Sequence, residues 1–242
     1  MNENFSFQSI GVVESCFKER FATPRQPGLV PMARARLIIN EEYRGALEGL
    51  EGFSHLWVVF VFHQNTNKTI KTKIHPPRMM GEKIGVFASR SPHRPNPIGL
   101  SVVKLIEIQG RELLVSGVDF IEGTPLLDLK PYIPVFDSVS TATQGWLDSK
   151  EILRLKVEFD DIALSKLSSY SKTSMYHSES ELKELIQQTL ELDPRPNFYK
   201  GTRENPDPYM SEYGFCVEDF NVVFQMRDGV AVVTDLIRDF KK

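Results

Sequence analysis

The chain has 242 residues and a formal net charge of −3; 41% of its residues are hydrophobic and 25% are charged. This balance is typical of a globular protein that buries a core without disulfides or metal. The two cysteines, Cys16 and Cys216, form no CxxC pair, so a disulfide scaffold and a zinc site are disfavoured and a reducing cytoplasm is expected. The N-terminus lacks a signal-peptide pattern, and no apolar run of about 18 residues predicts a transmembrane helix.

The distribution of charge is uneven. Residues 61–100 contain seven basic residues and one acid, Glu82, which gives this segment a charge of +6. From Asp148 onward, acidic residues outnumber basic ones. A basic patch on an otherwise acidic protein is compatible with a nucleic-acid partner, although solvated surface lysines explain the same pattern. The basic residues are Lys68, Lys71, Lys73, Lys83, Arg78, Arg90 and Arg94.

Short β-rich segments dominate the first half of the chain. Residues 41–53 indicate a short helical turn closed by glycines, and 105–117 resemble a hairpin with Gln109, Gly110 and Arg111 at its turn. Short strands at this spacing favour a closed sheet or barrel over a doubly wound parallel sheet. The predicted strands are residues 6–15, 32–40, 55–63, 83–89, 100–110 and 112–121.

The second half changes in character after about residues 138–150. Residues 178–194 predict an amphipathic helix that Ser178 or Ser180 caps and Pro194 ends. Its apolar face comprises Leu182, Leu185, Ile186 and Leu190. A proline-rich loop follows at 193–209, and 215–237 predict two strands joined by a turn at 227–229. We therefore expect a mainly β fold: a small, antiparallel-rich β-barrel domain in residues 1–145 and a smaller α+β domain in residues 146–242.

Two proline-rich loops carry polar side chains that a core does not require. In residues 23–28, Pro24, Pro27 and Gly28 fix a loop that holds Arg25 and Gln26. An arginine held in this way suits a carboxylate or phosphate, although a rigid turn with a surface arginine explains the same residues. Residues 89–99 contain three prolines between two apolar segments, and a stiff backbone lowers the entropy cost of binding. This second loop presents Arg90, His93, Arg94 and Asn96.

A third segment, residues 123–134, contains a possible catalytic pair. In an extended Leu-Asp-Leu-Lys stretch, Asp128 and Lys130 share one face, and Tyr132 follows nearby. The pair can form a polar pocket, or it can be a structural ion pair at a sheet edge. His63 and Gln64 come directly after a predicted buried strand, and strand ends commonly line pockets.

Together, PRQPG, SPHRPNPIGLS and the segment from Asp119 to Tyr132 closely resemble the TrmO (YaeB, TsaA-like) family, over about residues 7–140. The tail motif at Asp193–Pro196 with Tyr199 is also similar to the C-terminal domain of bacterial members. The resemblance implies a β-barrel that binds S-adenosyl-L-methionine without a Rossmann domain, as a homodimer with the cofactor near the subunit interface. It further implies N6-methylation of threonylcarbamoyladenosine next to the tRNA anticodon, without metal or a second cofactor.

The resemblance also implies roles for individual residues. Catalytic roles fall to Asp128, Lys130 and Tyr132, which should face the reacting centre; a carboxylate such as Asp128 can accept the proton of the acceptor nitrogen, directly or through water. Lys130 or Arg90 is expected to hold the substrate carbonyl or its threonyl carboxylate. The cofactor-binding residues are expected to be Pro24, Arg25, Gln26, His63, Gln64, Arg90, Leu100, Asp119, Ile121, Glu122, Gly123 and Thr124.

For tRNA, we expect phosphate contacts from five of the basic residues between 61 and 100. In the tail, a basic and aromatic group is expected either to contact an unpaired base of the anticodon loop or only to pack against the barrel or the other subunit. The alternative functions are a non-catalytic RNA- or nucleotide-binding barrel and an adaptor for acidic partners. The five expected phosphate contacts are Lys68, Lys71, Lys73, Arg78 and Arg94. The basic and aromatic group of the tail is Arg195, Tyr199, Lys200 and Arg203.

Overall fold

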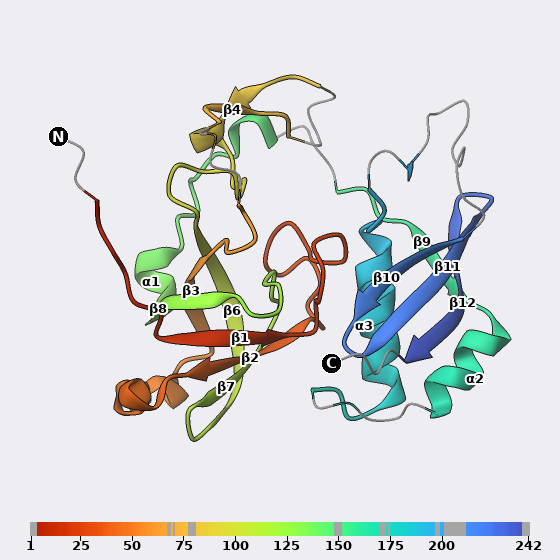
Figure 1. Cartoon of the computed structure of the whole chain (residues 1–242), viewed down its shortest axis with the longest axis horizontal. Helices are drawn as coiled ribbons and strands as arrows, with labels where there is room; N and C mark the ends of the chain where they lie inside the picture. The colour runs from red at the N-terminus through yellow and green to blue at the C-terminus, as the bar shows by residue number, and fades with distance from the viewer. Residues whose placement is uncertain are drawn as a thin grey trace.

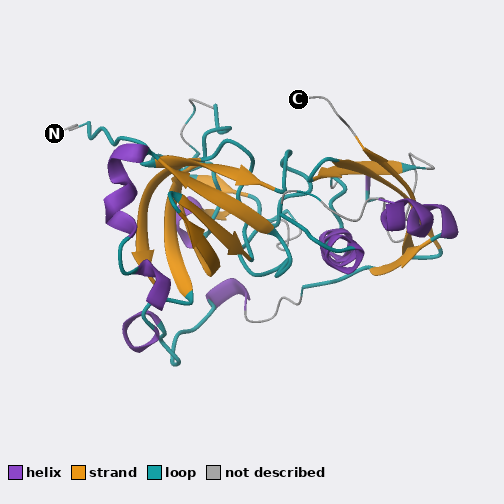
Figure 2. Cartoon of the chain, turned by 90° about the horizontal axis from the view of Figure 1, so that it is seen from below, coloured by secondary structure: helices purple, strands orange, loops and turns teal. Residues whose placement is uncertain are grey.

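The computed structural model describes residues 4–66, 69, 71–76, 81–147, 152–169, 173, 175–196, 199–200 and 212–238. The chain forms a β-barrel followed by an α+β region, which lie side by side (Figures 1 and 2). The predicted mainly β fold with a small antiparallel barrel is therefore confirmed. Within the described ranges, no helix is long and apolar enough to cross a membrane.

Six strands close into the barrel in the order β1-β2-β7-β6-β3-β8. All six pairings are antiparallel. The strands are β1 (Gly11–Ser15), β2 (Arg34–Ile39), β3 (His55–Val61), β6 (Ile98–Gln109), β7 (Glu112–Ser116) and β8 (Pro125–Pro131).

The barrel core is formed by apolar side chains that alternate with outward-facing residues along the strands. In β2 and β3 every second side chain is buried, as a pleated strand with one face inward requires. Leu56, Val58 and Phe60 of β3 point inward, and the Phe60 ring packs against Phe120 at 4.9 Å between centroids. Side chains at the intervening positions of β3 therefore lie on the outer face of the barrel.

Shorter elements connect and extend the barrel. The predicted helical turn is confirmed as two 3-10 helices, η1 (Glu41–Leu47) and η2 (Leu50–Gly52). The predicted hairpin is confirmed as the β6–β7 pair, with Gly110 at a φ of 62° in its turn. The remaining elements before residue 148 are β4 (Lys73–Ile74), β5 (Ile84–Gly85), η4 (Val86–Ala88), α1 (Pro134–Asp137) and η5 (Gly145–Leu147).

The α+β region contains a four-stranded sheet in the order β10-β11-β12-β9, in which β9 runs parallel to β12. Its predicted helix is confirmed as α3 (Glu179–Glu191); the Ser178 hydroxyl oxygen accepts the cap hydrogen bond from the Glu181 amide. The other elements are β9 (Lys156–Phe159), α2 (Asp161–Ser169), β10 (Tyr213–Val217), β11 (Phe220–Arg227) and β12 (Val230–Arg238). The predicted apolar face of α3 is buried.

Some sequence predictions were wrong. Residues 83–89 form only the two-residue strand β5 before η4, because the Ser89 amide and hydroxyl both donate to the Val86 carbonyl and so form a turn. The first strand begins at Gly11 rather than at residue 6. The segment 215–227 is divided between β10 and β11, because Glu218 adopts a left-handed φ of 51° in a tight turn. β9 and α2 were not predicted from the sequence.

Glycine at position 11 is required by the close approach of β1 and β2. A Cβ atom at Gly11 would lie 2.3 Å from the Ile38 carbonyl oxygen. We therefore predict that Gly11→Ala destabilises the protein by about 1–3 kcal/mol, which is the usual cost of overpacking, as measured by urea unfolding. Gly45→Ala is the matched control, because no atom lies within 4 Å of its added methyl group. Equal stability of Gly11→Ala and the wild type would contradict this packing.

Candidate functional site

The two proline-rich loops meet through a hydrogen bond between their polar side chains. Arg90 Nη1 donates to Gln26 Oε1 at 2.6 Å, and the Gln26 amide nitrogen donates to the Arg25 carbonyl at 2.6 Å. Pro24 is buried, and Gly28 adopts a φ of 76° with its amide bonded to the Gly117 carbonyl at 2.8 Å. Segments that are 64 positions apart in the sequence thus form one polar surface.

Asp119 lies beside this surface as a partly buried carboxyl group. The Ser101 hydroxyl donates to Asp119 Oδ1 at 2.6 Å. Burial raises the pKa of Asp119 to about 6, although the Ser101 hydrogen bond and the nearby charge of Arg90 act in the opposite direction. The amide of Gln26, the cation of Arg90 and the titratable carboxyl group of Asp119 therefore lie together.

The neighbouring stretch from Ile121 to Thr124 makes mostly structural contacts. Glu122 Oε2 accepts hydrogen bonds from the Ser15 amide at 2.7 Å and from Lys18 Nζ at 3.0 Å. The buried Thr124 hydroxyl donates to the Ile121 carbonyl at 2.6 Å, and Gly123 adopts a φ of 73°. These bonds hold the stretch against β1, and its contact with a cofactor stays a prediction.

His63 and Gln64 lie just past the end of β3, as expected. The Arg20 side chain donates to both Gln64 oxygens, at 3.0 Å to Oε1 and 2.7 Å to the carbonyl. Asn65 links the same strand end to the second proline-rich loop, because its amide donates to the Pro92 carbonyl at 2.8 Å. Sequence reasoning missed Arg20, Asn65 and Ser101; only the position of Asn65 beside His63–Gln64 gave a signal.

A second group lies on the outer face of β6, β3 and β8. Leu100, Val59 and Asp128 are lateral neighbours on adjacent strands, and Trp57 and Lys130 lie in the next row. Opposite residues in neighbouring strands lie close enough for their side chains to interact. Leu100 is 55% exposed, so an apolar side chain borders the acid and its partner.

Asp128 and Lys130 form the ion pair that their spacing predicts. Lys130 Nζ lies 2.7 Å from Asp128 Oδ2, with 65% and 48% of the two side chains exposed. A pair this exposed contributes little to stability, and β8 lies between β1 and β3 rather than at a sheet edge. The Tyr132 ring packs against Trp57 at 5.7 Å between centroids. These features disfavour a purely structural role for the pair.

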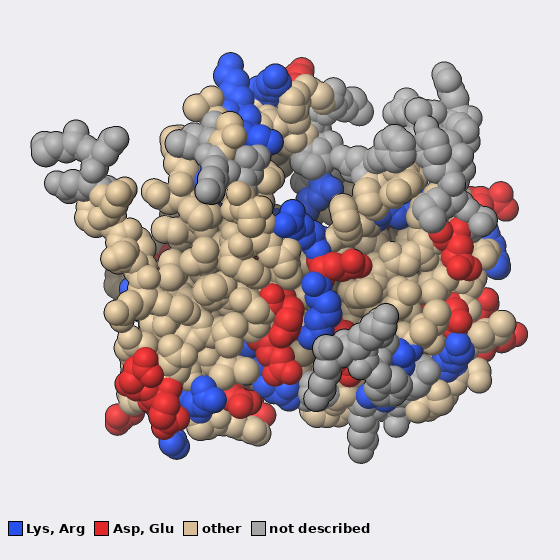
Figure 3. All heavy atoms as spheres, viewed as in Figure 1, with Lys and Arg blue, Asp and Glu red and all other residues tan. Residues whose placement is uncertain are grey.

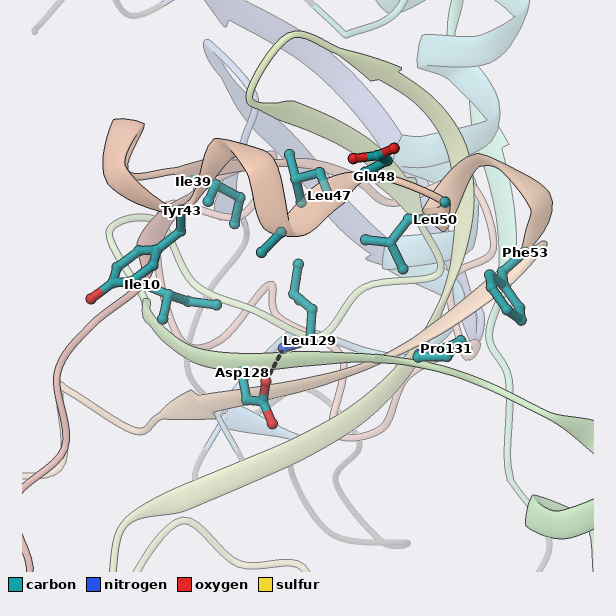
Figure 4. A pocket seen from close by; sticks show the side chains of 12 residues that line it. Ile10, Ile39, Tyr43, Leu47, Glu48, Leu50, Phe53, Asp128, Leu129 and Pro131 are labelled. Carbon is teal, nitrogen blue, oxygen red and sulfur yellow. Dashed lines mark hydrogen bonds between the residues drawn. The ribbon is translucent and has the colours of Figure 1, made fainter.

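A hollow of about 410 Å³ lies at the end of β1 that is opposite the two proline-rich loops. Apolar residues of η1, η2 and β8 line it, together with Tyr43 and Phe53. Figure 4 shows the Leu129 side chain directed into the hollow and the Asp128 carboxylate directed away from it. Asp128 thus lies at the border of the hollow, whereas Gln26, Arg90 and Asp119 are not among the residues that line it.

The basic residues expected to contact phosphate are in different situations. Lys71 and Lys73 are exposed, whereas Lys68 and Arg78 lie outside the described residues. Arg94 Nη1 donates to the Ser89 carbonyl at 2.8 Å, so its guanidinium supports the turn around η4. In Figure 3, the charged side chains on the projection around β4 are mainly Lys and Arg.

The tail residues pack more than expected. Arg195 is 8% exposed, and its guanidinium pairs with Asp193 at 2.9 Å. Tyr199 packs edge-on against Tyr213, and Lys200 Nζ donates to the Asp193 carbonyl at 3.0 Å. Arg195 and Tyr199 thus pack within the α+β region, which neither alternative named, and their contact with RNA stays a prediction; Arg203 lies outside the described residues.

The fold and these groups define a class of protein: a closed six-stranded β-barrel with polar, proline-rich loops at one end, joined to an α+β region. Among the residues described, no cluster of three or more His, Cys, Asp or Glu side chains is suited to a metal ion. Family models for the tRNA-methyltransferase O N-terminal domain and the TrmO C-terminal domain match residues 12–138 and 153–239. The chain belongs to the TrmO family, which confirms the resemblance.

Individual relatives agree with this membership. The Escherichia coli K12 protein named tRNA (adenine(37)-N6)-methyltransferase is 37% identical over 232 residues, which cover 93% of this chain and 94% of that protein. A human protein of the same name is 48% identical over 151 residues, 60% of this chain and 34% of that protein. The crystal structure of TrmO from Pseudomonas aeruginosa has a TM-score of 0.75 and 35% identity, covering 97% of this chain and 100% of that one.

The raised pKa of Asp119 predicts a specific pH dependence of stability. Because the carboxyl ionises near pH 4 in the unfolded chain and near pH 6 in the folded one, its contribution to stability falls as pH rises through this window. Asp119→Asn should therefore be more stable than the wild type by on the order of 2–3 kcal/mol at pH 7.5 but not at pH 3.5. Urea unfolding at both pH values measures this difference.

Glu218 provides no confounding contribution to this comparison. Burial raises its pKa to about 7, so it also makes stability depend on pH, but it is present in both proteins. The difference between variant and wild type thus reports on Asp119. A difference of equal size at the two pH values would contradict the assignment.

Proposed function

We propose that this protein is an S-adenosyl-L-methionine-dependent tRNA methyltransferase that methylates N6 of threonylcarbamoyladenosine at position 37, next to the anticodon. The observation that carries the proposal is the near full-length similarity to the Escherichia coli protein named tRNA (adenine(37)-N6)-methyltransferase. A Pseudomonas aeruginosa relative, 40% identical over 90% of both chains, is named a putative S-adenosylmethionine-dependent methyltransferase.

The groups at the loop end of the barrel fit the chemistry of this cofactor. S-adenosyl-L-methionine carries a carboxylate, an ammonium group and a sulfonium cation. Arg90 offers a planar fork of donors for the carboxylate, and Asp119 offers a carboxyl group for a cationic part. The other proposed contacts are Pro24, Arg25, Gln26, His63, Gln64, Leu100 and residues 121–124.

The chain's own contribution to catalysis is positioning and proton removal. The sulfonium group supplies an activated methyl, so much of the rate enhancement comes from holding donor and acceptor in line. The acceptor nitrogen is urea-like and weakly nucleophilic, and it must lose a proton. Asp128 is the proposed general base; Lys130 orients its carboxylate through the 2.7 Å ion pair. Tyr132, packed on Trp57, borders the same face.

Lys130 and Arg90 are the two proposed cations for the substrate's own acid group. The threonyl moiety carries a carboxylate, and charge-assisted hydrogen bonds to a carboxylate are among the strongest in proteins. Lys130 lies on the outer face of β8 beside Asp128, whereas Arg90 belongs to the loop group. The two positions allow one cation to bind substrate while the other binds cofactor.

Binding of the anticodon stem-loop is proposed to use the projection around β4 and β5. Lys71, Lys73 and Lys83 are exposed there, and Glu82 is the one acidic residue of that segment. Phosphate contacts by lysine supply affinity with little dependence on sequence. Figure 3 is compatible with this proposal, because Lys and Arg are more abundant than Asp and Glu among the charged residues of this projection.

A homodimer in the cytoplasm completes the proposal. Val135, Phe136, Val139 and Leu100 are each more than half exposed, and apolar surface of this kind commonly marks a subunit interface. Neither Cys16 nor Cys216 forms a disulfide, which is compatible with a reducing compartment.

Transfer of a labelled methyl group tests the function directly. We predict that the protein transfers tritium from methyl-labelled S-adenosyl-L-methionine to tRNA that contains threonylcarbamoyladenosine. Otherwise identical tRNA with unmodified adenosine should accept no label, because its N6 lacks the threonylcarbamoyl group whose carboxylate Lys130 or Arg90 is proposed to bind. Binding of both ligands without transfer would instead support the non-catalytic RNA-binding barrel.

A substitution at Asp128 separates catalysis from binding. Asp128→Asn keeps the shape of the side chain but removes its basicity, so kcat should fall about a hundredfold or more while the Kd for the cofactor stays unchanged. Glu158→Gln is the control, because it disrupts another exposed ion pair, with Lys156 at 2.6 Å, in the α+β region. Near-normal turnover of Asp128→Asn would leave Asp128 without a role as the base.

A further inference from the structure

The segment between β1 and β2, residues 16–33, leaves the barrel and carries the proline-rich loop at its tip. Its first stem is residues 16–19 and its second stem is residues 29–34, which includes the first residue of β2. Both stems face the α+β region: Figure 1 shows the loops after β1 turned toward α3 and β10. The stems therefore connect the tip to elements nearly 200 positions further along the chain.

The first stem is held by the end of β10. Phe17 and Val217 form an antiparallel bridge, and the Glu218 amide donates to the Cys16 carbonyl at 2.6 Å. The Cys216 amide donates to Glu19 Oε1 at 2.9 Å. Cys16, Phe17 and Val217 are fully buried, so these bonds are shielded from water. The Thr23 hydroxyl donates to the Glu19 carbonyl at 2.7 Å, which extends the connection to the tip.

The second stem obtains its backbone partners from side chains of the α+β region. The Tyr176 hydroxyl donates to the Met32 carbonyl at 2.9 Å and accepts from the Arg34 amide at 2.8 Å. Gln188 Oε1 accepts from the Met32 amide at 3.0 Å. Backbone amides and carbonyls that are shielded from water need hydrogen-bond partners. For the Met32 amide and carbonyl and the Arg34 amide, these partners are the side chains of Tyr176 and Gln188.

Two arginines extend this second contact along α3. Arg154 donates to the Leu29 carbonyl at 3.2 Å and pairs with Glu191 at 2.8 Å. Arg34 pairs with Glu181 at 2.5 Å, and its guanidinium lies over the Tyr176 ring at 5.0 Å. Two α3 residues, Glu181 and Gln188, thus contact the second stem directly, and Glu191 in the last turn is linked to it through Arg154.

We infer that the α+β region clamps both stems of this segment and thereby sets the affinity of the barrel for its cofactor, with Tyr176 and Gln188 as positioning residues. The inference rests on the proposed cofactor role of Pro24, Arg25 and Gln26. Neither positioning residue belongs to the cofactor loops. Each acts by restricting the conformations of the tip before binding, which lowers the entropy cost of binding.

The test uses the full chain and two conservative substitutions. Tyr176→Phe removes the hydroxyl but keeps the ring beneath Arg34, and Gln188→Met keeps the side-chain length but removes the acceptor. Gln187→Met is the matched control, because this exposed neighbour bonds only along its own helix, to Glu191 at 3.1 Å. Calorimetry gives the Kd for S-adenosyl-L-methionine, and amide hydrogen exchange without ligand gives the protection of residues 20–34.

Gln188→Met should bind the cofactor roughly fivefold more weakly, as expected for one hydrogen bond to the stem, and Tyr176→Phe, which loses two, should bind it at least as weakly. Residues 29–34 should exchange faster, kcat at saturating cofactor should stay near the wild-type value, and Gln187→Met should match the wild type. A merely structural role would lower the unfolding temperature without changing the Kd. Unchanged affinity in both variants would overturn the inference, as would weaker affinity with unchanged exchange.

Failure of the proposed function is distinguishable from failure of the clamp. A wild-type protein that binds no S-adenosyl-L-methionine would refute the proposed function and, with it, the claimed effect on cofactor affinity. Wild-type binding together with unchanged binding in Tyr176→Phe and Gln188→Met would leave the function intact and remove only the clamp.

Discussion

Closure of the barrel through β1 is the constraint on which the rest of the structure depends. This five-residue strand pairs with β2 along its length and with β8 at Gly11 and Val12. At its far end, the Ser15 hydroxyl donates to the Phe120 carbonyl at 2.8 Å, and the Ser15 amide bonds to Glu122. Closure therefore brings residues 120–122, which precede β8, against the end of β1 at Ser15. The two proline-rich loops meet at this end of the barrel.

Asp119 illustrates the cost of such a site. Its pKa of about 6 means that the ionised carboxyl is disfavoured by its surroundings at neutral pH, although Ser101 and Arg90 reduce that penalty. A protein that needed only stability would use an apolar or amide side chain there. Strained or partly unsatisfied groups of this kind are common where a ligand binds.

Periodicity made the barrel strands predictable, because a half-buried strand must alternate. The pattern of Ala35, Leu37 and Ile39 inward with Arg34 and Arg36 outward needs no tertiary information. Residues 83–89 were mispredicted because their turn depends on local bonds from Ser89, which hydropathy does not register. The division of β10 from β11 at Glu218 depends on a left-handed backbone position that a non-glycine residue rarely adopts.

The site was predictable in its parts and not in its assembly. Stiff polar loops and the Asp128–Lys130 spacing were visible in the sequence, and the ion pair is present as expected. The contacts of Arg90 with Gln26 and of Ser101 with Asp119 join distant segments, so no local pattern predicts them. The same holds for Tyr176 and Gln188, whose partners lie more than 100 positions away.

A crystal structure with bound S-adenosyl-L-methionine would show whether the cofactor lies at the loop end of the barrel. We expect the cofactor in contact with Gln26 and Arg90, with a cationic group near Asp119 and its methyl directed toward the face that carries Asp128. Cofactor bound instead in the hollow lined by Tyr43 and Phe53 would contradict this placement.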